Sequence, residues 1–272
     1  MVTDTINVPA DFGIDLGGRY PIEGAVEWAV EHDVKNIDVR LTDRLRPEEY
    51  DDDEIARIND LCDDHDISLG LHTLSAVNTA EFTPILRDAI QEYMFSYIDI
   101  AAMVNADRTI VHGGYHFTGD VDERTEASLQ RLEEMIAHAE EKDVTLLLEN
   151  MNPEPADAEV HYLCSKLDDV EQYFERLESP NLRWAFNPPH AHLHEEGIDG
   201  YIDALDVGIC REVRLNDNRG VREEHLVPGE GTIDFENLFA RLEESGYEGP
   251  YTVAQATLDE TFEAIERLVE KR

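Results

Sequence analysis

The chain is poor in cysteine, in lysine and in long apolar runs. Its three cysteines, Cys62, Cys164 and Cys210, lie far apart without Cys-x-x-Cys spacing. We therefore predict neither a disulfide framework nor a thiolate zinc site, and expect three reduced, buried thiols. No run approaches the ~18 apolar residues of a membrane span. The N-terminus lacks the basic segment and apolar core of a secretion signal, so we expect a soluble, cytoplasmic protein.

Acidic residues dominate the charge of the chain. They number 62 against 22 basic residues, of which only four are lysines, and the formal net charge is −40. Such an excess destabilises a compact domain by self-repulsion at low salt, yet the hydrophobic content of 42% is that of a globular protein. The composition resembles that of proteins from extreme halophiles, in which molar salt screens charge within about 3 Å. It also argues against nucleic acid as a partner, because phosphate backbones bind basic patches.

Strand-like apolar runs alternate with amphipathic helical segments along the chain. Eight strands are predicted, at residues 12–17, 36–41, 67–73, 107–114, 144–152, 181–187, 212–217 and 250–256. Helices are predicted at residues 21–34, 53–66, 83–106, 123–143, 166–179, 232–246 and 257–272. This alternation favours parallel strands joined by crossover helices.

No linker interrupts the alternation, so we predict one α/β domain over residues 1–272, a single (β/α)8 TIM barrel. A doubly wound open sheet is the alternative. That fold usually carries a glycine-rich phosphate loop after its first strand, and GIDLGG at 13–18 lacks the required spacing. In a barrel the active site lies where the strands end, so polar residues at strand ends are the candidates for function.

The fifth predicted strand is an apolar run that ends at Glu149. Burying a lone carboxylate costs several kcal/mol unless a metal, a cation or hydrogen-bond donors meet it; the alternative is a Glu that turns into solvent. Other strand ends favour a buried site, because they carry His72, His112 with His116, Asn187 with His190, Arg214 with Asn216 and Asp217, and then His225. Imidazole with carboxylate is the ligand mix for zinc, manganese or iron, and an amide such as Asn150 can orient the carboxylate.

Six segments resemble the xylose isomerase-like TIM barrel superfamily, which holds sugar isomerases and epimerases and also zinc-dependent apurinic endonucleases. They are LHT around His72, VHGG around His112, LLLENMN around Glu149, FNPPH at 186–190, RLNDNRG at 214–220 and EEHLVPGEGTIDF at 223–235. The resemblance covers essentially the whole chain. It implies a divalent metal at the barrel mouth and chemistry on a polyhydroxylated substrate.

The resemblance also implies which metal ligands remain. The single-metal epimerases use a Glu, an Asp, a His and a second Glu, and these positions here read Glu149, Asn187, Arg214 and Ala254, with Gln255 as the neighbour of the last. The second Glu, which exchanges a proton with the substrate, is therefore missing. Against the three-metal endonucleases, two ligand sets remain: His72, His112 and Glu149, and, with one replacement, His190, Glu223 and His225. We predict zinc or manganese at the first set and a weaker site at the second.

Arg214 stands where the epimerases have a metal ligand. Strand alternation places Glu212, Arg214 and Asn216 on one face. If that face lines the lumen, the guanidinium can neutralise Glu149 in place of a metal; otherwise it pairs with Glu212 or Asp217 near the strand end.

These residues define a candidate site and three hypotheses. Glu149, Arg214 and Asn187 are the predicted catalytic residues, and Tyr115, Asn150, Asn216 and Asp217 the predicted substrate contacts. The leading hypothesis is a metal-dependent isomerase or epimerase of a small sugar, sugar phosphate or related polyol. The alternatives are a barrel that is catalytically reassigned or that binds a small ligand without catalysis, and an apurinic endonuclease-like metallohydrolase. A homo-oligomer is compatible with the sequence.

Overall fold

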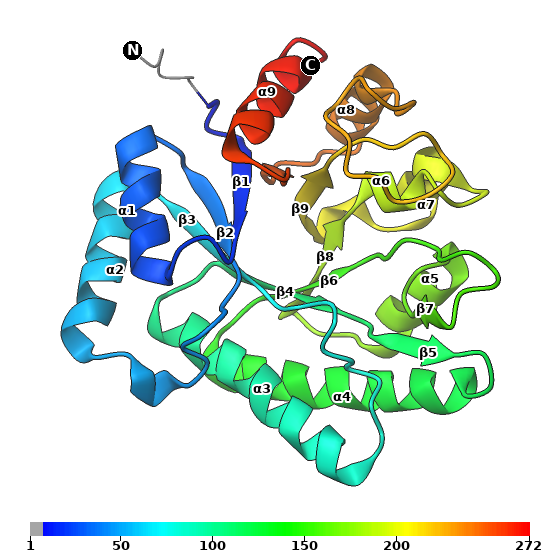
Figure 1. Cartoon of the computed structure of the whole chain (residues 1–272), viewed down its shortest axis with the longest axis horizontal. Coiled ribbons are helices and arrows are strands. Elements are labelled where there is room, and N and C mark those ends of the chain that lie inside the picture. Colours follow the sequence, from blue (N-terminus) through cyan, green and yellow to red (C-terminus); the bar gives the residue numbers. More distant parts are fainter. Residues whose placement is uncertain (1–7) are drawn as a thin grey trace.

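The computed structural model describes residues 8–272 and contains a closed barrel of parallel strands (Figure 1). Residues 1–7, on which the expected lack of a secretion signal partly depends, lie outside the described residues. The barrel strands are β1 (Phe12–Gly17), β2 (Asn36–Val39), β3 (Ser68–His72), β4 (Arg108–His112), β6 (Leu146–Glu149), β8 (Leu182–Phe186), β9 (Cys210–Leu215) and β10 (Tyr251–Val253). They follow one another around the barrel, and β10 pairs with β1 to close it. The predicted (β/α)8 barrel is confirmed.

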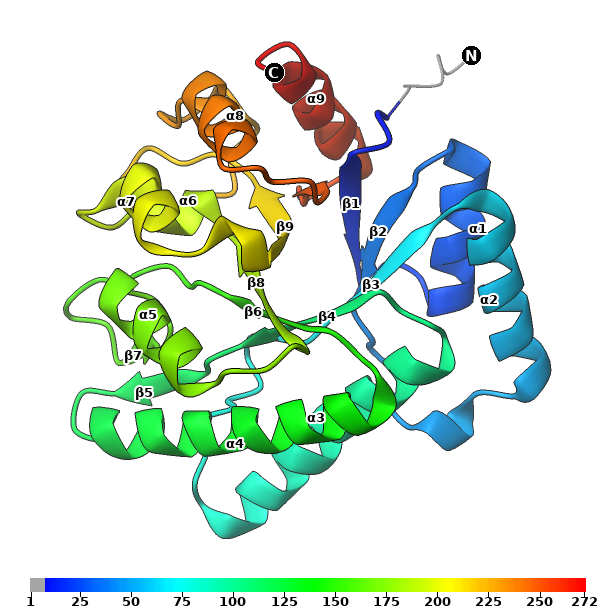
Figure 2. The ribbon, with the colours of Figure 1, turned by 180° about the vertical axis from the view of Figure 1, so that it is seen from behind.

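Helices surround the strands, and Figure 2 shows the same ring from behind. They are α1 (Ile22–His32), α2 (Asp52–His65), α3 (Pro84–Met103), α4 (Val121–Lys142), α5 (Leu167–Arg176), α6 (Pro188–Ala191), α7 (Gly197–Ala204), α8 (Phe235–Glu244) and α9 (Leu258–Val269). Leu129, Leu132 and Ile136 share one face of α4 and are buried in the hydrophobic core. Within residues 8–272, no helix combines the length and the apolar character needed to cross a membrane.

Several elements were not predicted. A small antiparallel pair, β5 (Tyr115–Phe117) with β7 (Val160–Tyr162), lies beside the barrel, and α6 and α7 fill the connection from β8 to β9. Strands of three residues are too short for alternation to reveal, and this pair joins segments that are distant in sequence. One expectation about the thiols was also wrong: Cys164 and Cys210 are buried, but Cys62 is only partly so.

Charged side chains fill the middle of the barrel lumen. Asp38 and Glu212 each contact both Arg108 and Arg214, so that two carboxylates and two guanidiniums form a closed ring. All four side chains are buried. Gly70 makes room for the ring, because a Cβ at that position would collide with Asp38 Oδ1. This ring of four side chains lies in the lumen directly below the residues at the carboxyl ends of the strands.

Candidate active site

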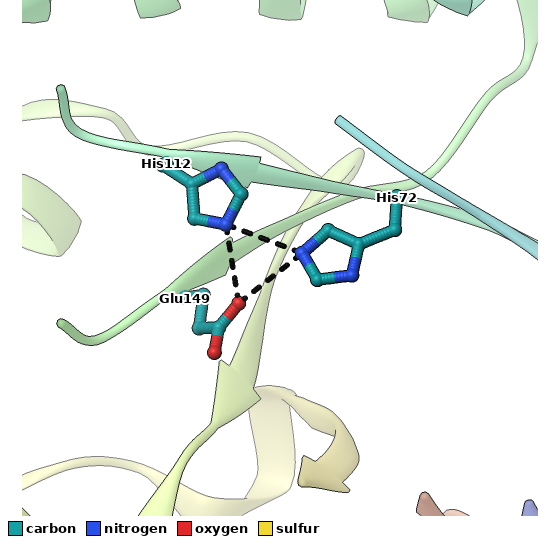
Figure 3. A group of neighbouring side chains, drawn as sticks. All are labelled: His72, His112 and Glu149. Atoms are coloured by element: carbon teal, nitrogen blue, oxygen red, sulfur yellow. Dashed lines mark hydrogen bonds and ion pairs between the residues drawn. The ribbon is translucent and has the colours of Figure 1, made fainter. Parts of the chain in front are cut away.

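Three side chains from neighbouring strands converge at the mouth of the barrel. His72 ends β3, His112 ends β4 and Glu149 ends β6, so parallel pairing brings their side chains to the same edge (Figure 3). His72 Nε2 lies 3.2 Å from His112 Nε2 and 3.6 Å from Glu149 Oε2, and His112 Nε2 lies 3.3 Å from the same oxygen. Three potential ligand atoms thus form a nearly equilateral triangle.

The triangle has the dimensions of a metal site. Ligand atoms about 2.0–2.1 Å from a zinc ion at tetrahedral angles lie about 3.3 Å from one another. The Nδ1 atoms both face oxygen acceptors: His72 Nδ1 lies 3.1 Å from Asp15 Oδ2, and His112 Nδ1 lies 3.4 Å from Thr73 Oγ1, which donates its own hydrogen to Ile110 O. Arg214 Nη2 lies 3.2 Å from His72 Nδ1, but it approaches Asp15 Oδ2 more closely, at 2.5 Å. Each Nδ1 can therefore hold a ring hydrogen and leave the Nε2 lone pair facing Glu149, as metal-binding histidines do.

The electrostatics of the cluster suit a cation. Burial opposes ionisation of Glu149, but hydrogen bonds with His112 and His72 and the charge of Arg214 hold its pKa well below its usual range. Burial and Arg214 also oppose protonation of His72, yet its contacts with Asp15 and Glu149 outweigh them and raise the pKa of His72 to about 9. Burial lowers the pKa of His112. The carboxylate is therefore ionised at neutral pH, and one imidazole takes up a positive charge beside it.

Asn187 orients Glu149, the role that the sequence analysis gives to Asn150. Asn187 Nδ2 donates a 2.7 Å hydrogen bond to Glu149 Oε1. Asn150 is fully buried; its Oδ1 accepts from the backbone N–H of Asn187 and from Trp184 Nε1, and its Nδ2 donates to Asn187 O. The prediction that Asn150 contacts Glu149 or substrate was therefore wrong, because its side chain turns away from the mouth to brace the next strand end.

Arg214 combines the two roles that the sequence left open. Its side chain lies in the lumen, with Nε 3.7 Å from Glu149 Oε1, so it contributes positive charge on the side of Glu149 away from the imidazoles. Nη1 lies 2.5 Å from Glu212 Oε1 and 2.7 Å from Asp38 Oδ2, and Nη2 lies 2.5 Å from Asp15 Oδ2. The pairing with Glu212 is thus confirmed, and Asp217 is not a partner. The guanidinium is fixed by three carboxylates below and beside the cluster.

The second predicted ligand set is looser. His190 Nε2 lies 3.6 Å from Glu223 Oε2, whereas His225 Nε2 lies 3.4 Å from the other oxygen, Oε1. The two imidazoles therefore approach different oxygens, and among residues 8–272 only His72, His112 and Glu149 gather three ligand atoms within 4.8 Å of one another. Both Glu223 oxygens are shielded from solvent and lack a well-aligned hydrogen bond within residues 8–272. Burial raises the pKa of this carboxyl, and contacts with His190, Asn216 and His225 only partly oppose that rise.

A cavity of about 880 Å³ opens over both groups at the carboxyl ends of the strands. Asn216, a predicted substrate contact, lines it, but Tyr115 and Asp217 do not. The neighbouring strand of the small sheet supplies Tyr162 to the lining instead of Tyr115. Asp217 is fully buried, and its carboxylate accepts backbone hydrogen bonds from Gly229, Gly231 and Ile233. Asp217 therefore holds the loop after β9 in place instead of facing the cavity, and a substrate contact through Tyr115 stays a prediction.

A sequence profile of the family described as Xylose isomerase-like TIM barrel matches residues 26–270. The chain belongs to this family. Among its relatives, an uncharacterized protein of Methanocaldococcus jannaschii is 25% identical over 221 residues, which are 79% of this chain and 74% of that protein. Fructoselysine 3-epimerase of Shigella flexneri is 28% identical over 164 residues; this match spans 59% of the chain and little more than half, 56%, of the epimerase.

Solved structures of the xylose isomerase-like barrel extend the comparison. A D-tagatose 3-epimerase-like protein superposes with a TM-score of 0.80 at 23% identity, covering 96% of both chains. Endonuclease IV from Thermus thermophilus superposes with a TM-score of 0.73 at 17% identity, covering 96% of this chain and all of that one. At these identities the likeness shows the fold alone.

The last epimerase position, at the end of β10, carries no carboxylate. Thr252 is in register with the lumen-facing Arg214, so Ala254, two residues on, falls on the lumen face. Gln255 also lines the cavity, but its Nε2 donates to Leu226 O.

Asp15 is a residue of the site that was not predicted; its carboxylate contacts His72 and Arg214. Its place in FGIDLG was a usable signal, since alternation puts Gly13, Asp15 and Gly17 on one face of β1.

Proposed function

We propose that this chain is a metal-dependent sugar epimerase or isomerase that acts on a small polyhydroxylated substrate at the mouth of the barrel. The observation that carries the proposal is the convergence of His72 Nε2, His112 Nε2 and Glu149 Oε2 in one cavity of about 880 Å³. Similarity to a fructoselysine 3-epimerase, although over part of its length, supports the reaction class. Three protein ligands leave a coordination position for substrate.

His72, His112 and Glu149 would hold zinc or manganese, and the residues around them would orient these ligands and balance their charge. When bound, the cation would polarise a carbonyl or hydroxyl oxygen of the substrate. Asp15 and Thr73 keep the Nε2 atoms of His72 and His112 turned toward Glu149. Asn187 keeps Glu149 Oε1 engaged, so that Oε2 is the oxygen presented to the cation. Arg214 limits the charge repulsion between Glu149 and Asp15.

Glu223 is our candidate for the group that exchanges a proton with the substrate. An epimerase or isomerase must remove a proton from carbon or oxygen and return one, and Glu149 is unsuited because both its oxygens are engaged. Glu223 lines the same cavity, and both its oxygens are shielded from solvent with imidazoles 3.4–3.6 Å away. Burial raises the pKa of this carboxyl more than contacts with His190, Asn216 and His225 lower it. A raised pKa brings a carboxyl closer to the range in which it can both accept and donate a proton.

Deuterium incorporation tests the proposal. Metal-loaded protein is incubated with ketohexoses and ketopentoses in deuterium oxide, and exchange at carbon is followed by NMR together with the appearance of the epimer or isomer. We expect exchange with the intact chain, none with His112→Ala, and at least about 10²-fold slower exchange with Glu223→Gln at unchanged content of the first metal. His192→Ala, which changes a histidine bonded to Thr232, is the matched control and should retain exchange.

The two alternatives give different results in the same preparation. Sugar binding without exchange or turnover in any of these substrates would contradict the proposal and favour a barrel that only binds its ligand. Two metal ions per chain, the second lost in Glu223→Gln, would assign Glu223 to the second predicted site with His190 and His225. Hydrolysis of abasic DNA by that two-metal protein would then favour the endonuclease.

A further inference from the structure

Two arginines on one side of the cavity have no acidic partner. Arg19, after β1, and Arg40, after β2, both line the cavity. Within residues 8–272 no carboxylate lies within 4.0 Å of either guanidinium, although the chain has 62 acidic residues. In a protein with net charge −40, two arginines left unpaired beside the candidate site indicate a negatively charged ligand.

The fold aims both side chains at the mouth. Arg40 follows β2 directly, and its N–H donates to Gly17 O at 2.9 Å, so the strand alternation continues and puts Arg40 on the same face as the lumen residue Asp38. Arg19 is fixed from behind, because its Nη1 donates to Leu16 O at 3.1 Å and its Nη2 to Gln255 O and Ala256 O, each at 2.9 Å. One guanidinium is therefore held in place, and the other has no hydrogen-bond partner within the described residues.

A glycine leaves the space between these guanidiniums open. A Cβ at Gly17 would lie 3.8 Å from Arg19 Nη1 and 4.0 Å from Arg40 Nη2, so both cations lie close to one point. Gly17 also has φ +54°, a conformation that other residues adopt only with strain. A larger side chain at this position would fill the gap that an oxyanion can enter.

Asp15 connects this gap to the metal cluster. Its Oδ1 accepts the Gly17 N–H at 2.7 Å, and its Oδ2 lies 3.1 Å from His72 Nδ1. The space between the arginines is thus next to the strand end that positions a predicted metal ligand. A substrate whose reacting carbon is at the cluster can place its far end between the guanidiniums.

We propose that Arg19 and Arg40 form an oxyanion subsite, and that the substrate is a ketose with a phosphate or carboxylate at the end remote from the reacting carbon. The inference rests on the proposed function for the reaction at the other end of the substrate. A guanidinium binds phosphate and carboxylate alike through charge-assisted hydrogen bonds, so the same two arginines could bind a sugar phosphate or a sugar acid.

Binding of three matched probes tests the subsite. D-fructose, D-fructose 6-phosphate and D-fructuronate differ only at the remote carbon, and each is titrated calorimetrically into the full chain in molar potassium chloride. We expect at least one of the anions to bind about 10-fold or more tightly than D-fructose, in line with hydrogen bonds to charged groups. The tighter of the two anions identifies the substrate as a sugar phosphate or a sugar acid.

Variants that each remove one arginine charge, inside or outside the subsite, distinguish binding at the subsite from a general effect of net charge. Arg40→Gln and Arg19→Gln should each lose most of the preference for the anion while binding D-fructose as before. Arg211→Gln is the control: Arg211 is exposed, donates only to backbone carbonyls and lies at the start of β9, at the opposite end of the barrel. Equal affinity for all three probes, or an equal loss in Arg211→Gln, would overturn the proposal.

Failure of the subsite and failure of the proposed function give different results. Anion preference that depends on Arg40, without deuterium exchange in any bound probe, keeps the subsite and rejects the epimerase or isomerase. Exchange of neutral ketoses without any anion preference keeps the reaction and rejects the subsite.

Discussion

Asn187 Nδ2 donates a 2.7 Å hydrogen bond to Glu149 Oε1, so the two oxygens of this carboxylate have different surroundings. Oε1 faces the amide and Arg214, whereas Oε2 faces the imidazoles of His72 and His112. Because the amide of Asn187 contacts the oxygen that turns away from the imidazoles, we expect Asn187 to position Glu149 at the predicted metal site and not to act as a ligand.

Metal content should respond differently to loss of a ligand and loss of this hydrogen bond. His112→Ala should remove most of the bound metal, measured by elemental analysis of protein dialysed in high salt. Asn187→Ala should keep full occupancy at saturating metal but bind about 10–100-fold more weakly, because it removes only the group that orients a ligand. His192→Ala should match the intact chain. Equal loss of stoichiometry in the first two variants would instead place the ion centrally, between β6 and β9.

Metal binding should release a proton at neutral pH. In the metal-free fold the pKa of His72 is raised to about 9, above the about 6.5 of an unfolded chain. Its protonation therefore adds stability that is complete below about pH 6.5 and is lost as the pH rises through about 9. A cation must displace that proton, so its affinity should increase up to about pH 9. Calorimetric zinc titrations at about pH 7 in buffers of different ionisation enthalpy measure the release, and a value near zero would contradict the assignment.

Removing the charge of Arg214 should destabilise the fold strongly. Arg214→Met retains much of the side-chain volume but leaves Asp15, Asp38 and Glu212 facing one another in the lumen. Breaking a buried ion network by removing one partner typically costs about 3–5 kcal/mol. Urea unfolding at fixed salt measures the loss, with Arg211→Gln as the control for charge alone. A cost below about 1 kcal/mol would mean that the carboxylates take up protons without penalty.

Salt should stabilise the protein. The net charge of −40 opposes compactness unless counterions screen it, so the melting temperature should rise with potassium chloride into the molar range. An uncharged osmolyte at matched osmolarity is the control for preferential exclusion. A flat or falling curve would show that the acidic residues are compensated by ion pairs within the fold.

The sequence predicted the barrel and the convergence of three side chains at its mouth because both depend on short-range patterns. Apolar runs mark the strands, and the parallel arrangement then brings residues at their ends, such as His72, His112 and Glu149, to one edge. Contacts between a side chain and a distant segment of the chain were not predictable in this way. Asn150 and Asp217 carry polar groups near strand ends, but most of their partners are backbone atoms of distant segments, so their direction is decided by tertiary contacts. Asp15 was missed because its partners lie on β3 and β9.

The buried ring of the lumen has a consequence for which ion the cluster accepts. Four carboxylates, Asp15, Asp38, Glu149 and Glu212, face two guanidiniums, Arg108 and Arg214. Burial and the charge of Asp38 raise the pKa of Glu212 to about 7, so this carboxyl is only partly ionised at neutral pH. With both imidazoles neutral, the interior then carries between one and two excess negative charges. A divalent cation offsets more of this excess than a monovalent ion does, and the difference grows as Glu212 ionises above about pH 7.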